Sequence, residues 1–569
     1  MLSLSMATVR PPYICLTCKI HSKRILTGSP FRRGFFSSHP QLSSNTSSRP
    51  PTAPKPIPDI KHIRENAALF SQNCIDRNYS DLAQYPYKIQ RLSAESRELQ
   101  DALREPQRQI KQIESSIAKL MVSSRNPDIE GSQKRMTEEE LSSLRLSAQT
   151  LKDKSNHLTT ARTNHTKEIE RLALSLPNLT SPQTPPGPEP SLINYINYDP
   201  TSPSTTPLPT HHTSHVTIGT SLNLLNFTSA SLTSGWGWYY LTNEAALLEQ
   251  ALIQYSLSVA LRRGWQAISP PSLVYSHIAH ACGFQPRDAN NEQQVYHIEQ
   301  SERDVERGRP GRCLAGTAEI PLAAIFAGQE MAGNQLPAKV VGVSRCFRAE
   351  AGARGADTKG LYRVHEFTKV ELFGWAVPDE AGEGTDGGTA TTPVKGGSGS
   401  GIGKGSVTVS SLFYEILDLQ TEILTALNLP CRVLEMPTQD LGASAFRKRD
   451  IEVLFPSRMV SHSTSANANA NAHANAKDTT IDIESGWGEV TSASICTDYQ
   501  TRRLGTRMKA ANGGGSKFPH TVNGTAMAVP RIIAALLEHG WDERRGVVVL
   551  PEVLRGWMGG RRVIGGEEE

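Results

Sequence analysis

The sequence predicts an α+β protein in which an antiparallel β-sheet flanked by helices follows an N-terminal antiparallel α-helical coiled-coil arm. Three observations support this fold class. Two long heptad patterns lie near the N-terminus, charged and apolar residues alternate within residues 345–371, and helical patterns lie on either side of that stretch. At 569 residues the chain is too long for one ordinary domain, so at least two folded units are expected.

The first 58 residues differ in charge from the rest of the chain. They hold eight Lys or Arg and no Asp or Glu, whereas the remainder carries 52 basic and 56 acidic residues. Residues 31–38 (FRRGFFSS) are typical of a mitochondrial presequence cleavage region. We therefore predict a mitochondrial targeting leader and linker over residues 1–58, and a location in the mitochondrial matrix. A disordered basic tail is the alternative.

Two classes of protein are disfavoured. No stretch approaches the roughly 18 consecutive apolar residues of a membrane-spanning helix, so no membrane partner is expected. Cys15 and Cys18 form the one CxxC of the chain, and without a second pair a structural zinc site is not expected.

Residues 59–180 are predicted to form the arm. The first heptad frame contains Ile89, Leu92, Leu99, Leu103, Ile110, Ile113, Ile117 and Leu120. The second contains Leu141, Leu144, Ala148, Leu151, Leu158, Ile169, Leu172 and Leu176. A turn-rich stretch at residues 124–128 separates them, and Thr137 with Glu140 supplies a capping box for the second helix. Such a short connection predicts an antiparallel hairpin, in which Pro106 is expected to kink the first helix.

The partner of this hairpin is not decided by the heptads. Between Lys88 and Arg171 lie 16 basic and 13 acidic residues. A dimerisation coiled coil or a plain solvated hairpin would be the default for such an element alone.

After a predicted linker over residues 181–209, residues 210–569 read as a mixed domain. Helices are expected at Asn243–Gly264 and Leu412–Leu427, and strands at Lys339–Val343 and Val370–Val377. Two segments have a biased composition: Asp379–Gly405 is rich in Gly and Thr, and Ser461–Lys477 contains a repeated Ala-Asn. They are predicted to be disordered surface insertions.

The stretch richest in polar and charged residues covers residues 345–350 and 360–371. Its charges alternate with apolar residues, as on antiparallel strands that turn one face to a core and the other to a polar cleft. A cleft with several arginines suits a substrate that carries phosphate, because a guanidinium binds phosphate oxygens bidentately. The alternative is an exposed sheet face with ion pairs.

These residues resemble motif 2 of the class II aminoacyl-tRNA synthetases, in the form found in seryl-tRNA synthetases. The matching residues are Phe347-Arg348-Ala349-Glu350-Ala351-Gly352, the loop 357–361, and Arg363 to Glu371. Residues 523–531 (NGTAMAVPR) resemble motif 3, and the helix from Asn243 with the strand entering Pro271 resembles motif 1. Three further segments resemble the serine enzyme in particular: residues 316–322, residues 441–452, and residues 489–503.

The resemblance implies a class II catalytic domain that activates L-serine with ATP and transfers it to the 3′ end of tRNA(Ser). The implied catalytic residues are Arg348, Glu371 and Arg531. The implied ATP-binding residues are Arg348, Ala349, Glu350, Val364, Phe367, Glu489, Val490, Thr491, Ser492 and Arg531. The implied serine-binding residues are Thr317, Ala318, Glu319, Arg348, Glu371 and Thr525.

The family's chemistry also implies individual roles. Arg348 should hold the α-phosphate and the serine carboxylate, and Glu350 should meet the adenine amino group. Phe367 should stack on adenine, Arg531 should bind the γ-phosphate, and Glu489 should help hold Mg²⁺.

For serine, the implied contacts are Thr317 and Glu319 to the amino group, and Glu371 and Thr525 to the hydroxyl. A pocket that hydrogen-bonds a hydroxyl rejects alanine, because its own polar groups would be left unpaired.

The resemblance assigns the arm to tRNA(Ser) and, through motif 1, implies a homodimer. A catalytically inactive synthetase-like protein that binds tRNA or has a structural role is the alternative. Transfer of serine to a carrier protein is a third possibility, which the presence of the arm disfavours.

Overall fold

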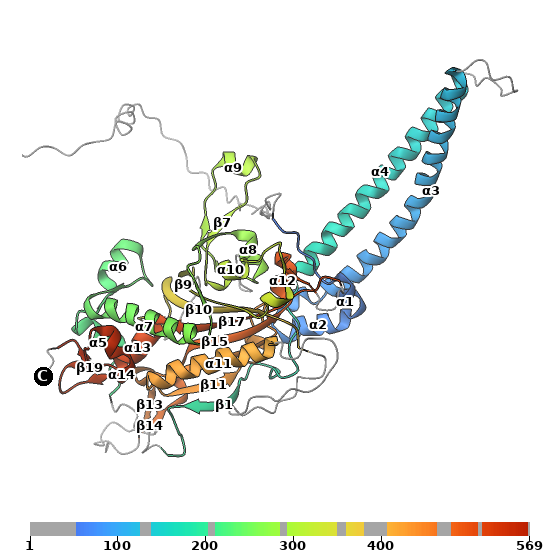
Figure 1. Ribbon diagram of the computed structural model, residues 1–569. Coiled ribbons are helices and arrows are strands. Elements are labelled where there is room, and N and C mark those ends of the chain that lie inside the picture. Colours follow the sequence, from blue (N-terminus) through green and yellow to red (C-terminus); the bar gives the residue numbers. More distant parts are fainter. Residues whose placement is uncertain are drawn as a thin grey trace, which may run out of the picture. The chain divides into compact units, whose positions relative to one another are not determined.

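The computed structural model describes residues 53–125, 138–202, 211–284, 293–349, 360–379, 407–463, 479–509 and 515–566. Within them an N-terminal helical region precedes a domain built on one large sheet (Figure 1). The predicted α+β class is confirmed. None of the helices in the described ranges is both long and apolar enough to cross a membrane.

The arm consists of two long helices on a small helical foot. Helix α3 (Tyr85–Arg125) runs alongside α4 (Glu138–Ser175), and the short helices α1 (Ile60–Glu65) and α2 (Ala67–Asp76) pack at their base (Figure 1). The predicted heptad hairpin is confirmed. The foot has its own core, formed by Ile63, Phe70, Cys74, Ala83, Ile89, Leu92, Ile169, Leu172, Ala173 and Leu176.

Charged pairs join the two long helices along their length. Lys88 Nζ lies 2.8 Å from Glu168 Oε1, and Lys152 Nζ lies 2.9 Å from Glu114 Oε1. Pro106 lies inside α3, which continues on both sides of it. The predicted turn at 124–128 begins too early, because residues 124 and 125 still belong to α3. Residues 126–128 and the capping residue Thr137 lie outside the described residues.

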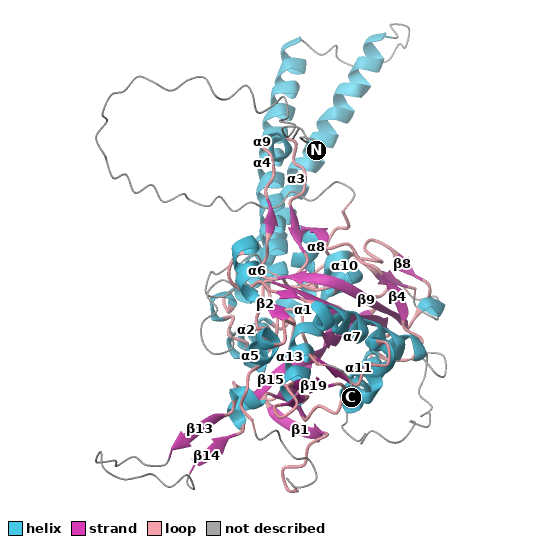
Figure 2. Cartoon of the chain, turned by 90° about the vertical axis from the view of Figure 1, so that its left-hand side faces the viewer, coloured by secondary structure: helices cyan, strands magenta, loops and turns pink. Residues whose placement is uncertain are grey.

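Eight strands form the main sheet, in the order β1-β11-β12-β15-β17-β10-β9-β4. Their bounds are β1 Ser191–Ile196, β11 Cys431–Glu435, β12 Arg447–Leu454, β15 Trp487–Thr497, β17 His520–Ala528, β10 Glu366–Ala376, β9 Ala338–Phe347 and β4 Gln266–Ile268. All neighbours pair antiparallel except β4 and β9, which are parallel. Figure 2 shows the strands of this sheet beside the helices α7 and α11.

Helices cover both faces of the sheet. The larger core joins it to α5 (His215–Ser221), α7 (Asn243–Arg262), α11 (Val409–Ala426) and α13 (Val529–His539). A second core lies with α8 (Ser276–Ala281), α10 (Glu319–Ala323) and α12 (Tyr499–Leu504). Along β10, Leu372 belongs to the first core and Phe373 to the second, because successive side chains of a strand point to opposite faces.

Smaller elements complete the domain. The remaining helices are α6 (Phe227–Ser234), α9 (Glu302–Glu306) and α14 (Glu552–Arg555). The remaining strands are β2 (Leu225–Asn226), β3 (Tyr240–Leu241), β5 (Leu273–Tyr275), β6 (His297–Ile298), β7 (Arg312–Leu314), β8 (Glu330–Met331), β13 (Val460–Ser463), β14 (Thr479–Asp482), β16 (Arg507–Met508), β18 (Trp541–Asp542), β19 (Val547–Val549) and β20 (Val563–Ile564).

The predicted elements are present with shifted ends. The two predicted helices are α7 and α11, and the two predicted strands are β9 and β10, which pair so that Glu366 faces Phe347. Both strands are longer than predicted because the charged residues that alternate with apolar ones also belong to them.

Two predicted irregular segments contain strands. The prediction of a linker over 181–209 is wrong at Ser191–Ile196, because these residues form β1, which pairs with β11. The Leu, Ile and Tyr residues of β1 favour a strand despite the surrounding Pro and Thr. The predicted insertion at Ser461 also begins too early, since β13 extends to Ser463 and pairs with β14 (Figure 2). Of the insertion at 379–405, Asp379 is described, and its carboxylate accepts hydrogen bonds from Ser410.

The predicted leader and linker are described only over residues 53–58. There Ile57 N donates a backbone hydrogen bond to Arg502 O (2.8 Å), so this end of the segment is attached to the domain built on the large sheet. Residues 1–52 lie outside the described part of the chain.

Candidate active site

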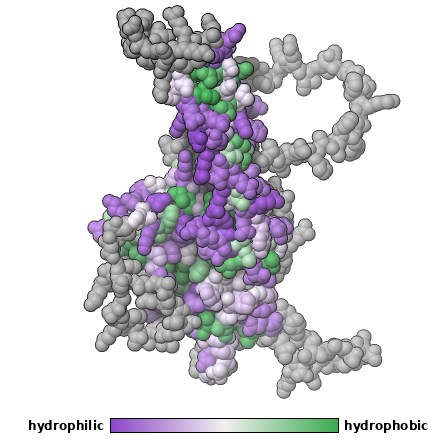
Figure 3. Space-filling view, turned by 90° about the vertical axis from the view of Figure 1, so that its right-hand side faces the viewer, coloured by the Kyte–Doolittle hydropathy of each residue, from purple (hydrophilic) through white to green (hydrophobic). Residues whose placement is uncertain are grey.

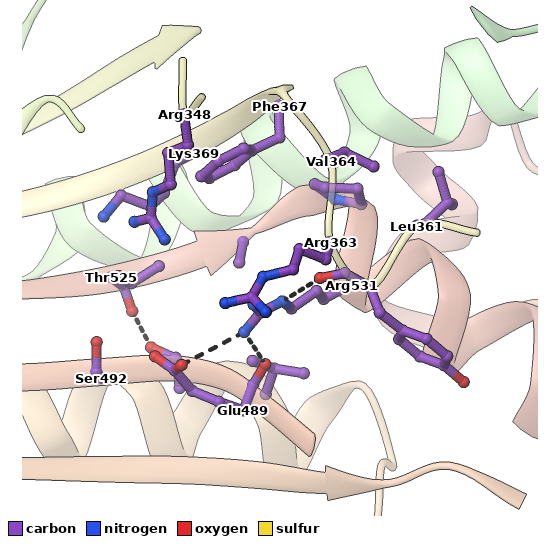
Figure 4. Close-up of a pocket in the computed structure, with 15 residues that line it drawn as sticks. Arg348, Leu361, Arg363, Val364, Phe367, Lys369, Glu489, Ser492, Thr525 and Arg531 are labelled. Carbon is purple, nitrogen blue, oxygen red and sulfur yellow. Dashed lines mark hydrogen bonds and ion pairs between the residues drawn. The ribbon is translucent and has the colours of Figure 1, made fainter. Parts of the chain in front are cut away.

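The site is a cleft over the middle strands of the sheet, where β10, β15 and β17 meet (Figure 4). Phe367 and Lys369 of β10 line it. Glu371 lies two residues further along the strand, and therefore on the same face. Glu371 lies opposite Thr525 of β17, and the next strand, β15, supplies Glu489 to Ser492. Antiparallel pairing therefore brings three segments that are distant in sequence to one surface.

Arg348 enters the cleft from the end of β9. Its backbone N donates to His365 O (2.9 Å), and its carbonyl lies 3.0 Å from His365 Nδ1. The guanidinium carbon lies 5.2 Å from the centre of the Phe367 ring, and the two side chains are neighbours in Figure 4. The backbone contacts fix where the arginine leaves the strand.

Arg531 enters from the first turn of α13 on the other side of the cleft. Its Nε donates to Tyr362 O (2.9 Å) and its Nη1 donates to Glu489 O (2.6 Å), as Figure 4 shows. The Glu489 carboxylate lies 3.4 Å from the same Nη1.

Glu489 stays ionised in this setting. Burial raises its pKa, but the positive charges of Lys448, Arg531, Arg348 and Lys369 outweigh burial and hold the pKa at about 2. The cleft therefore offers one permanent carboxylate among several cations.

A buried carboxylate lies on β10 beside the cleft. Glu371 is 2% exposed, accepts a hydrogen bond from Thr317 Oγ1 (3.2 Å) and forms an ion pair with Lys369. Burial raises the pKa of Glu371, and the charge of Lys369 opposes this. Its neighbour Thr525 is held through its carbonyl, which accepts from Gln420 Nε2 (2.9 Å) and from the Thr491 hydroxyl.

A second buried carboxylate, Glu319, begins helix α10. Its Oε1 accepts from Gln500 Nε2 (2.6 Å) and from Asn523 Nδ2 (3.0 Å). Burial and the negative charge of Glu371 raise the pKa of Glu319 to about 7. A carboxylate with this pKa can change its charge near neutral pH.

Most of the predicted site residues meet here. Those that line the cleft are Arg348, Val364, Phe367, Glu489, Val490, Thr491, Ser492, Thr525 and Arg531. Thr317, Ala318, Glu319 and Glu371 are buried, and hydrogen bonds or ion pairs join all but Ala318 of these to the residues around the cleft. Ala349 does not line the cleft; its N donates to Gln294 O (3.2 Å). Glu350 lies outside the described residues.

The sequence prediction missed four charged or amide side chains of the site. Arg363 and Lys369 line the cleft, and Gln500 and Asn523 hold Glu319. Lys369 could have been found, because period-two spacing puts it on one face with Phe367 and Glu371. Gln500 had no local signal, since it lies 181 residues from Glu319.

Comparisons with known proteins agree with this geometry. Residues 296–385 and 402–540 match the tRNA synthetase class II core domain (G, H, P, S and T), and residues 57–180 match the seryl-tRNA synthetase N-terminal domain. The mitochondrial serine–tRNA ligase of Saccharomyces cerevisiae is 37% identical over 461 residues, covering 80% of this chain and 86% of the relative. That of Schizosaccharomyces pombe is 34% identical, covering 88% and 87%.

A solved structure is similar as well. The seryl-tRNA synthetase of Pyrococcus horikoshii complexed with ATP superposes with a TM-score of 0.68 at 26% identity, covering 90% of this chain and 100% of that one.

Proposed function

The chain belongs to the serine–tRNA ligases, a family of class II aminoacyl-tRNA synthetases, and from this premise we propose how its residues perform the reaction. The enzyme uses ATP to activate L-serine as seryl-adenylate and transfers the seryl group to tRNA(Ser). One observation carries the residue assignment: two buried carboxylates, Glu371 and Glu319, interact with cations that line a cleft containing three arginines. The arginines suit the triphosphate of ATP, and the carboxylates suit the ammonium group and the hydroxyl of serine.

In the first step the serine carboxylate attacks the α-phosphorus of ATP and pyrophosphate leaves. No nucleophile from the protein is needed, so catalysis consists of positioning and of stabilising the charge that develops on phosphate. Arg348 is the residue for the α-phosphate and the serine carboxylate, and Arg531, on the far side of the cleft, is the residue for the γ-phosphate. Phe367 provides the surface on which adenine stacks. In the second step the terminal ribose hydroxyl of tRNA takes the acyl group.

Serine is recognised at both of its polar ends. Glu319, with Thr317, receives the ammonium group, while Glu371 and Thr525 receive the hydroxyl. Alanine would leave the Glu371 carboxylate without a partner from the substrate, at a cost of about 1–3 kcal/mol. Threonine must be excluded by the space available, which is a weaker discrimination of roughly 1–3 kcal/mol for one methyl group.

Serine binding should depend on pH through Glu319. Because its pKa is raised to about 7, this carboxyl is protonated below pH 7 and ionised above it, and only the ionised form attracts an ammonium group. The KM for serine should therefore rise about tenfold per pH unit as the pH falls below 7. Pyrophosphate exchange measured from pH 6 to 8 checks this. Glu319→Gln should raise KM and flatten the profile; a variant with the wild-type slope would contradict the assignment.

A magnesium ion fits the cleft at Glu489. Among the described residues no group of three or more His, Cys, Asp or Glu could hold a metal on its own. Mg²⁺ commonly uses one or two carboxylates together with substrate phosphates, and Glu489 offers an ionised carboxylate beside the arginine assigned to the γ-phosphate. When bound, the ion would neutralise phosphate charge, and Glu489 would hold it.

Glu489→Gln should weaken the response to magnesium. We expect the Mg²⁺ concentration for half-maximal ATP binding, measured by calorimetry, to rise about tenfold or more. The control is Glu452→Gln, which removes a carboxylate from the position opposite Glu489 on β12. Equal responses of the two variants would show that Glu489 does not hold the ion.

The arm is the proposed contact for tRNA(Ser). Hydrophilic residues cover much of the arm surface seen in Figure 3. The 16 Lys and Arg between Lys88 and Arg171 are the residues that can meet phosphate groups. The yeast relatives are named mitochondrial and the chain has an acid-free basic leader, which together support a mitochondrial enzyme; we place it in the matrix. We also propose a homodimer, from the resemblance to motif 1.

The decisive experiment is exchange of labelled pyrophosphate into ATP, followed by charging of tRNA. Exchange that depends on serine supports the assignment, and its absence would revive the inactive alternative. No finding favours that alternative, because the relatives are named as ligases and Arg348, Phe367, Glu371, Glu489 and Arg531 are all present.

A further inference from the structure

Helix α12 lies beside the foot of the arm (Figure 1), and its side chains contact both that foot and Glu319, the carboxylate assigned to serine. It follows β15 and ends at Gly505, whose φ of +65° is the left-handed conformation that commonly closes a helix. Three of its side chains, Gln500, Arg502 and Arg503, make contacts outside the helix. Their partners belong to different parts of the molecule.

The Gln500 side chain points toward Glu319, the carboxylate assigned to serine. It is fully buried, its Nε2 donates to Glu319 Oε1 (2.6 Å), and its Oε1 accepts from Thr521 Oγ1 (2.6 Å). The amide cannot rotate without losing both bonds, since its nitrogen faces an acceptor and its oxygen faces a donor. Gln500 therefore fixes one oxygen of the carboxylate that we assign to the serine ammonium group.

Arg503 points to the arm. Its Nη2 donates to the carbonyl oxygens of Leu174 and Leu176, both at 3.2 Å, where α4 ends. Helix α4 has no basic residue of its own in its last turn, so Arg503 supplies the cation at that helix end. Arg503 is 8% exposed, and its guanidinium also lies over the Tyr499 ring, with its carbon 3.4 Å from the ring centre.

Arg502 holds the segment that enters the arm. Its Nη2 lies 3.0 Å from Asp59 Oδ2, and Asp59 caps the first helix of the foot. Its carbonyl accepts the backbone hydrogen bond from Ile57 (2.8 Å). The chain that enters the arm and the chain that leaves it are thus both attached to α12.

We propose that Gln500 is a positioning residue for Glu319, and that α12 makes the affinity for serine depend on how Arg503 holds the foot of the arm. The contacts form one series: the end of α4, Arg503, the α12 backbone, Gln500 and Glu319. The proposal rests on the serine-binding role of Glu319 given above.

The same series predicts a change in pH dependence. Glu319 faces Glu371, Lys369 and Arg348, and the thiols of Cys282 and Cys496 lie near it. Against burial and Glu371, the hydrogen bond from Gln500 lowers the pKa of Glu319. Removing that bond therefore raises the pKa further, so the pH at which serine affinity is lost moves upward.

The test compares the KM values for serine and for ATP in pyrophosphate exchange from pH 6 to 8, without tRNA. Gln500→Leu should raise the KM for serine about tenfold or more, as expected for a lost hydrogen bond to a charged group, and shift its pH profile upward. Arg503→Met should raise it about three- to tenfold. The KM for ATP should stay within about twofold in both. Because Arg503 acts through Gln500, the double variant should be no worse than Gln500→Leu alone.

Two controls separate this proposal from others. Leu554→Ala removes a fully buried side chain of α14, outside the series, and reports what a general loss of stability does to KM. Arg503→Lys keeps the positive charge and should restore most of the affinity for serine. It keeps the proposal testable if Arg503→Met does not fold. Multiplicative effects in the double variant, or equal rises in both KM values, would overturn the proposal. If Glu319→Gln itself leaves the KM for serine unchanged, the serine-binding role of Glu319 is wrong as well. If Glu319→Gln raises this KM but Gln500→Leu does not, the proposed function stands and this inference fails.

Discussion

Arg348→Ala should lower serine-dependent pyrophosphate exchange by about 10³-fold, mainly in kcat. In the proposed mechanism one guanidinium serves both reacting groups, the α-phosphate and the serine carboxylate, and its charge matters most when charge develops at phosphorus. Arg348→Lys should recover little of the loss, since an ammonium group cannot bind two oxygens in the plane of a guanidinium. The measurement is steady-state exchange at saturating ATP and serine.

Arg345 provides the matched control, because it lies three residues earlier, at the end of the same strand. It is half exposed, and its guanidinium lies 3.7 Å from Glu249 and 3.9 Å from Glu366. Arg345 itself is half exposed, both of its contacts are long, and the buried Glu249 also accepts a hydrogen bond from Thr368 Oγ1, so Arg345→Ala should change exchange by no more than about threefold. If both alanine variants lost activity equally, the loss would reflect the strand as a whole, and the assignment of Arg348 would be wrong.

This pair of arginines also shows how far the sequence leads. Alternation at period two correctly predicts that β9 and β10 are paired strands, and that Phe367 and Glu371 share a face. It cannot say which arginine faces the cleft. Arg345 lies among ion pairs, as the alternative interpretation had it, whereas Arg348 lines the cleft because it follows the last residue of the strand.

Features that depend on long-range contacts were not predictable from the pattern. Strand β1 is short, and its first four residues are exposed, so only its pairing with β11 distinguishes it from the surrounding loop. The bond between Gln500 and Glu319 likewise depends on where the sheet places α12. Family motifs identified the segment that contains Gln500, but they supplied no partner for its side chain.

Shortening the arm should strongly lower tRNA charging while sparing adenylate formation. Removing all of Ile89–Leu172 would be a poor test, because Ile89, Leu92, Ile169 and Leu172 are buried against Ile63 and Phe70 in the foot. A cleaner variant deletes residues 99–161 and joins the helices with a short Gly-Ser linker. It retains that core and the ion pair between Lys88 and Glu168.

In this variant, serine-dependent exchange should stay within about twofold of the intact enzyme, because the cleft and α12 keep all their contacts. The kcat/KM for charging should fall by about 100-fold or more, if the proposed phosphate contacts of the arm supply much of the affinity for tRNA. The remaining activity should also respond less to salt, because fewer counterions are released on binding. Charging that survives the deletion with its salt dependence intact would mean that tRNA is held elsewhere, and the arm would return to being a plain solvated hairpin.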